Sequence, residues 1–193
     1  MSRIVTFTIT TAVVLMLTGG TQASQATTTL PAGSQTAKPS SQSDYMTSGR
    51  DEDFLKEVAQ ASQIEVESSK LAMTKAQNAE VKAFAEKLVK EHTAASEELN
   101  TLVKSRHAEW KDDDPKFVEK KRKHESLQKL TGADFDKEYL EDMISDHEST
   151  IALFARYSLN ASDTALKSFA DKTQPTLREH LKMARDLKAR VSK

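Results

Sequence analysis

A helix pair that occurs twice is the feature that most constrains how this chain can fold. The stretch VKAFAEKLVKEH, residues 81–92, returns as LKSFADKTQPTLREH, residues 166–180. Ahead of these, the pentamer DFLKE at residues 53–57 returns as DFDKE at residues 134–138. One shared pentamer would be weak evidence, but matches that keep their order across a whole helix pair indicate an internal duplication.

Apolar residues recur at steps of three and four through four segments, and this is the period of an amphipathic helix. The seam positions, in chain order, are Phe54, Val58, Ala61, Glu65, Ser68 and Ala72; Val81, Phe84, Leu88, His92, Ala95, Leu99 and Leu102; Tyr139, Met143, His147, Thr150, Phe154 and Tyr157; Leu166, Phe169, Thr173, Leu177, His180, Ala184, Leu187 and Val191. Only 5 Gly and 4 Pro interrupt 193 residues, so the pattern predicts an all-α fold.

Turn lengths predict how the four helices are connected. Short turns near Gln77 and Ser162 make the two helices of each pair antiparallel, and residues 106–133 form a longer crossover between the pairs. The expected architecture is an antiparallel four-helix bundle built from two duplicated hairpins. The second copy carries three extra residues at 173–175, ending in Pro175, which predicts a kink or a short break that restarts at Thr176. That break is either a tolerated surface kink or a device that repositions His180.

The N-terminal residues have the pattern of a secretory signal peptide. Arg3 precedes an apolar run at residues 4–17, and small residues follow, with cleavage expected after Ala23 or, alternatively, Ala26. The apolar run is shorter than the roughly 20 residues needed to span a bilayer, which disfavours the alternative of a membrane anchor. We therefore expect a signal peptide at 1–23, a flexible Ser/Thr/Gln/Pro linker at 24–50, and the bundle domain at 51–193.

Compartment and partners follow from the leader and the charge. The chain has no cysteine, hence no lipid-acceptor site, which predicts a periplasmic or secreted protein without stable membrane insertion after cleavage. A formal net charge of -1 argues against nucleic acid as a partner and leaves an envelope protein as the candidate. The oligomeric state is left open.

Four polar residues occupy seam positions, one on each predicted helix. They are Glu65, His92, His147 and His180. A rise of about 1.5 Å per residue from the turns brings all four into one layer within roughly two helical turns. Three imidazoles and a carboxylate suit zinc, copper or iron, so these residues are predicted metal ligands.

Three neighbouring acids, Glu91, Asp146 and Glu179, are available to the same layer as further ligands or outer-shell acceptors. The alternative is a purely structural layer, in which hydrogen bonds between buried polar groups fix the register of the bundle. A misjudged register, which would place these side chains on the surface, is a third reading.

The segments EVESSKLAMTKAQNAEVKAFAEKLVKEH, LTGADFDKEYLEDMISDHE and LKSFADKTQPTLREHL resemble the bacterial domain of unknown function 4142. The resemblance covers nearly all of residues 54–187. It implies an exported protein of the ferritin-like superfamily of four-helix bundles, and it brings no established reaction.

Ferritin-like di-iron sites use Glu-x-x-His motifs. The residues three before His92, His147 and His180 are Val89, Ile144 and Leu177, so ferroxidase activity does not carry over. Two functions remain: a bundle that binds a transition metal, or a non-catalytic periplasmic envelope or stress-related protein whose histidine layer is structural.

The predicted leader and linker can be tested on exported protein. We expect N-terminal sequencing to start near Ser24, and limited proteolysis to remove residues up to about 50 while leaving a helical fragment, because the composition of this segment cannot form a core. A protease-resistant segment that begins near Ser24 would contradict the linker.

Overall fold

The computed structural model describes residues 42–106 and 114–192, with side chains from residue 50 onward. These residues form five helices: α1 (Gln42–Lys75), α2 (Ala79–Ser105), α3 (Pro115–Leu127), α4 (Gly132–Asn160) and α5 (Thr164–Val191). The described part of the chain contains no strand, which confirms the all-α class. None of these helices is long and apolar enough to cross a membrane. The predicted signal peptide lies outside the described residues, as does most of the predicted linker.

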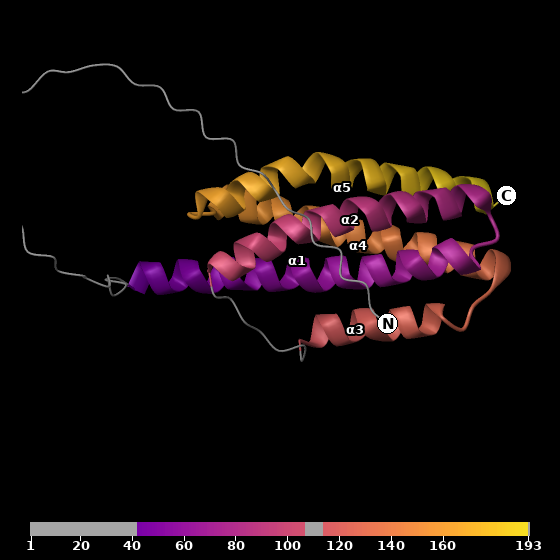
Figure 1. Cartoon of the computed structure of the whole chain (residues 1–193), viewed down its shortest axis with the longest axis horizontal. Helices are drawn as coiled ribbons and strands as arrows, with labels where there is room; N and C mark the ends of the chain where they lie inside the picture. Colours follow the sequence, from indigo (N-terminus) through magenta and orange to yellow (C-terminus); the bar gives the residue numbers. More distant parts are fainter. Residues whose placement is uncertain (1–41, 107–113, 193) are drawn as a thin grey trace, which may run out of the picture. The chain divides into compact units, whose positions relative to one another are not determined.

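The helix pairs are those expected from the repeat. α1 packs most extensively on α2, and α4 on α5, while α1 also contacts α4 and α2 also contacts α5 (Figure 1). Phe54, early in α1, stacks on Tyr157, late in α4, with ring centroids 3.9 Å apart, so α1 and α4 are antiparallel. Glu98 near the end of α2 pairs with Lys172 near the start of α5, so these two helices are antiparallel as well. The four long helices therefore form a helical bundle.

Side-chain caps start two of the four long helices. Asn78 accepts hydrogen bonds from the backbone N–H groups of Glu80 and Val81 at the start of α2. Asp163 does the same for Ala165 and Leu166 at the start of α5. The buried carboxylate of Asp136 accepts from the backbone N–H groups of the α1–α2 turn, which holds that turn against the start of α4.

The predicted seam is confirmed, because every seam position is buried or half-buried. The first helix starts earlier than expected. α1 begins at Gln42 rather than at residue 51, so residues 42–50 belong to the helix and not to the linker. Composition indicates whether a segment can be buried, but a helix that is already nucleated by a packed segment extends at little cost, because each added residue gains one hydrogen bond.

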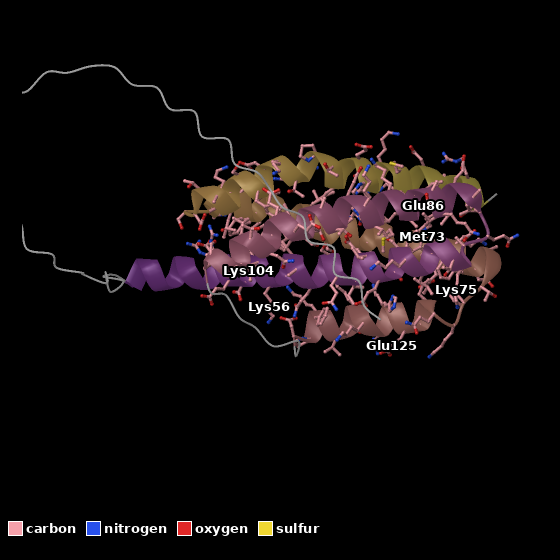
Figure 2. All side chains as sticks on the ribbon, in the orientation of Figure 1. Lys56, Met73, Lys75, Glu86, Lys104 and Glu125 are labelled. Atoms are coloured by element: carbon pink, nitrogen blue, oxygen red, sulfur yellow. The ribbon has the colours of Figure 1, made fainter. Side chains whose placement is uncertain are left out.

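The crossover between α2 and α4 has close to the bounds that were predicted, but it contains a helix, α3, that was not predicted. Asp114 caps α3, Pro115 starts it, and Phe117 and Leu127 bury its inner face. α3 lies along α1, and Figure 2 labels Lys56 and Lys75 on that side of α1. Lys56 pairs with Asp114 at 3.1 Å, and Lys75 donates to the Leu130 carbonyl at 3.2 Å. Helix α3 therefore covers parts of α1 and α4.

The predicted break at Pro175 is absent, because α5 runs without interruption through it. Pro175 is exposed, so the backbone groups around it can bond to water rather than remain unpaired in the core. Thr173, half-buried, donates its hydroxyl to the carbonyl of Phe169 at 2.7 Å within the same helix. The helical register therefore carries through to His180.

Candidate metal centre

The histidine layer, defined as Glu65, His92, His147 and His180, divides the core into two apolar clusters. On each helix the layer residue lies between a member of one cluster and a member of the other. On α2, for example, Leu88 belongs to the cluster nearer the α1–α2 turn, and Leu99 belongs to the cluster at the far end. The amphipathic seam that packs the helices thus also fixes the height of the four polar side chains.

The layer is buried and its rings are close together. His147 is 0% exposed, His180 1%, Glu65 2% and His92 7%. The three ring centroids lie 5.3 to 5.5 Å apart. One nitrogen from each ring lies within 4.8 Å of the nitrogens of the other two. The sequence prediction that helices α2, α4 and α5 bring these histidines together is confirmed.

Two of the three imidazoles have an N–H whose position is fixed by an acceptor. The Nδ1 of His147 lies 2.8 Å from the carbonyl oxygen of Met143, which can only accept, so this nitrogen carries the proton. The Nδ1 of His92 lies 3.1 Å from a carboxylate oxygen of Glu65 and donates to it. In the neutral form of each ring, Nε2 is then left with a free lone pair.

The third imidazole is fixed from the opposite side of its ring. His180 Nε2 lies 2.6 Å from Glu91, whose other oxygen is 2.7 Å from the ammonium of Lys87. Burial opposes the charge of Glu91, but hydrogen bonds from Lys87 and His180 hold its pKa below the ordinary value, so Glu91 is an acceptor here. Burial lowers the pKa of His180 to about 4, which keeps the ring neutral at pH 7. The lone pair of His180 is therefore on Nδ1.

These assignments leave two lone pairs facing each other. His147 Nε2 and His180 Nδ1 are 3.3 Å apart, and with the protons placed as above neither has a hydrogen to donate. His92 Nε2 is buried and has no hydrogen-bond partner among the described residues. An unpaired buried nitrogen is costly, and a cation between the three rings would satisfy all of them.

Glu65 supports the layer from α1. Burial alone would raise its pKa, but Coulombic attraction to Lys120 and to the protonated forms of His92, His147 and His180 outweighs burial and holds the pKa of Glu65 below its ordinary value. One oxygen accepts from His92, and the other, Oε1, lies 4.0 Å from His147 Nδ1 and is without a hydrogen bond from any described residue. Burial also lowers the pKa of His92 more than Glu65 raises it.

The predicted acids lie at different distances from the rings. Glu65 is in the layer as expected, but it contacts His92 as a hydrogen-bond acceptor and is not part of the close group of three nitrogens. Glu91 contacts His180, as predicted for an outer-shell acceptor. Asp146 forms an ion pair with Lys120 of α3, and Glu179 forms one with Lys87 at 3.3 Å. The ion-pair partner of each of these two acids is therefore a lysine and not a layer histidine.

Three contributors were missed from the sequence. The Met143 carbonyl is a backbone group, and no sequence pattern shows that a histidine four residues later will donate to it. Lys87 could have been found, because it lies four residues before Glu91 on the same helix face. Lys120 comes from α3, a helix that was not predicted, so its position beside Asp146 could not be inferred.

The depressed pKa of His180 predicts a pH dependence of stability in metal-free protein. The unfolded chain protonates His180 near pH 6.5 and the folded chain only near 4, so the unfolded state binds an extra proton between these values. Stability is therefore full above pH 6.5 and is lost as pH falls to 4, by about 3 kcal/mol for this residue.

Urea unfolding of chelator-treated protein from pH 7 to 4 would measure this loss. His180→Gln should show a shallower decline than the parent, and His124→Gln, which removes a half-buried histidine of α3, should retain the parent's decline. Equal declines in His180→Gln and the parent would show that His180 is not held neutral by the fold.

The comparisons with known proteins identify a family. The model of the family described as Domain of unknown function (DUF4142) matches residues 36–187, which include the whole histidine layer. No curated protein and no solved structure matches the chain. The family match covers well over half of the sequence, and the chain therefore belongs to the DUF4142 family.

Proposed function

We propose that this chain is an exported, ferritin-like four-helix bundle that binds one divalent transition metal through His92, His147 and His180. One observation carries the proposal: three buried imidazoles donate their N–H groups outward, to Glu65, Met143 and Glu91, and leave their lone pairs for a shared centre. Histidines that bind metals almost always donate their other ring nitrogen to a carboxylate or a backbone carbonyl. All three rings follow that rule.

Distances are compatible with a metal after a small movement. A tetrahedral metal with bonds of about 2.0–2.1 Å to nitrogen needs donors roughly 3.3 Å apart. His147 and His180 already have this separation, at 3.3 Å, and the whole set lies within 4.8 Å. His92 would have to approach by on the order of 1 Å, a change that side-chain rotation can supply.

Charge balance supports a divalent ion. Three neutral imidazoles add no charge, while Glu65 and Glu91, both held ionised, lie directly behind two of them. A dication in this layer would therefore be separated from each of the two carboxylates by a single imidazole ring. Their negative charge offsets the cost of burying the positive charge of the metal. Imidazole donors suit zinc, copper and iron, and a set of three leaves a fourth position for water or another ligand.

The arrangement of helices supports the ferritin-like part of the proposal. α1 and α2 form one antiparallel pair and α4 and α5 the other, with a long connection that includes α3 between them. Export rests on the N-terminal sequence pattern of a basic residue, an apolar run and small residues. The family match begins at residue 36, beyond that pattern.

A structural layer is the second candidate, favoured by the acceptor that each imidazole already has within the bundle. In that case the protein would be a non-catalytic envelope or stress-related protein, and the histidines would only set helix register. The two candidates differ in whether metal stabilises the fold.

Metal titration with thermal unfolding separates them. Zinc, copper or ferrous iron added to chelator-treated protein should raise the melting temperature, with a stabilisation of about 2.7 kcal/mol at a free-metal concentration a hundred times the dissociation constant. His92→Ala and His180→Ala should lose this response, because each removes one of three ligands. His124→Ala is the matched control and should respond like the parent, since His124 lies on α3 and bonds to Ser68.

The metal-induced shift is compared within each variant, so any change in its basal stability cancels. No stabilisation by any of the three metals, or the same response in the two layer variants and the parent, would leave the structural layer as the better account.

A further inference from the structure

We propose that a cavity beside the histidine layer binds a small, uncharged, largely apolar molecule. The cavity has a volume of about 40 Å³ and is lined at one end by Glu65, His92 and His180. The remaining wall is predominantly apolar and includes Leu99 and Phe154. The cavity lies on the side of the layer that faces the apolar cluster of Leu99, which is the cluster farther from the α1–α2 turn.

The volume sets the size of the occupant. A single water needs about 10–15 Å³ measured in this way, and a cavity that holds benzene measures about 150 Å³. A space of about 40 Å³ therefore fits a molecule of about two or three heavy atoms, or one xenon atom. Small residues, among them Ala61 and Ala95, line the space together with the rings of Phe154 and Phe169.

The wall chemistry sets the polarity of the occupant. A charged ligand would lose its hydration against Val58, Leu99 and Leu177 without gaining polar partners there, so it is excluded along most of the cavity. Apolar cavities of proteins stay dry and bind apolar guests such as xenon. At the opposite end, His92 Nε2 and Glu65 Oε1 are the buried atoms that lack a hydrogen bond from any described group. A guest can thus lie in an apolar space and still reach the layer.

An entrance is located by the exposure of the lining residues. Those from α1 and α4 are all buried, whereas the half-buried ones come from α2 and α5. They include Ala95 and Ser96 on α2 and Thr173 and Thr176 on α5.

Contacts between α2 and α5 flank this point on both sides. Glu98 binds Lys172 at 2.6 Å on one side, and His180 donates to Glu91 at 2.6 Å on the other. The half-buried lining residues between these two contacts mark the route that we propose from the surface to the cavity.

The role of the guest depends on the proposed function, but its binding does not. If a metal occupies the layer, the guest would lie next to two of the residues that would hold the metal, His92 and His180, and the cavity would then select which small molecules come near it. If no metal binds, the cavity still accepts the same guest. Metal-free protein is therefore the right material for the test.

Xenon is the probe, and methyl NMR of the full chain is the readout. Xenon under pressure should give saturable shifts at the methyl groups of Val58, Leu99 and Leu177, which line the cavity. Ala95→Leu, which adds a side chain at the entrance, should lose these shifts. Ala94→Leu is the matched control, because Ala94 is exposed on the same helix, and it should retain them.

The parent protein alone can overturn the proposal, so it does not depend on the folding of a variant. Absence of xenon shifts at these methyls in folded parent protein would show that the cavity is filled by water held at its polar end. Shifts that persist in folded Ala95→Leu would place xenon elsewhere. A separate zinc titration of the parent distinguishes the two proposals. Xenon binding without zinc binding would support the cavity proposal and contradict zinc binding by the layer. Zinc binding without xenon binding would support the metal proposal and contradict the cavity proposal.

Discussion

The hydrogen bonds that fix the imidazole protons are the interaction on which the rest of the site depends. A buried histidine has one donor and one acceptor in its neutral form, so an acceptor placed at one nitrogen decides what the other nitrogen can do. Met143 holds the proton of His147, and the carboxylates of Glu65 and Glu91 hold those of His92 and His180. The three remaining nitrogens have only lone pairs, and the fold places them at one height in the bundle.

The histidine layer is not what the packing of an apolar core requires. An apolar side chain at each of the four positions would join the two apolar clusters into one core. The chain instead buries three imidazoles and an ionised carboxylate between them. Such a layer costs desolvation energy unless every group finds a partner, and His92 Nε2 and Glu65 Oε1 have none among the described residues. An unsatisfied layer in an otherwise well-packed core is typical of a site that has a ligand.

The sequence predicted what depends on helix periodicity. The duplicated pattern located the seam, and the seam located Glu65 and the three histidines at one height, since rise per residue is nearly constant in a helix. It did not predict α3, whose short charged sequence has no strong period, or the early start of α1 at Gln42. Pro175 was expected to kink or break the helix, but its exposed position allows α5 to continue.

Roles within the layer could not be predicted, because side-chain direction and proton position depend on contacts between helices. The sequence could not show that Glu65, an expected ligand, accepts from His92, or that Asp146 is bonded to Lys120 of the unpredicted helix. Glu91 could be placed beside the layer from its position next to His92, but it contacts His180 on α5. Periodicity gives the height of a residue and not its partner.

The tautomers of the three rings test the central claim most directly. Long-range ¹H–¹⁵N correlation spectra of chelator-treated protein at pH 7 report which nitrogen of each neutral imidazole carries the proton. The account predicts protonation of Nδ1 in His92 and His147 and of Nε2 in His180. A proton on Nδ1 of His180, which would donate to His147, or a doubly protonated ring would show that the layer satisfies itself by hydrogen bonding, and would contradict a centre built to receive a metal.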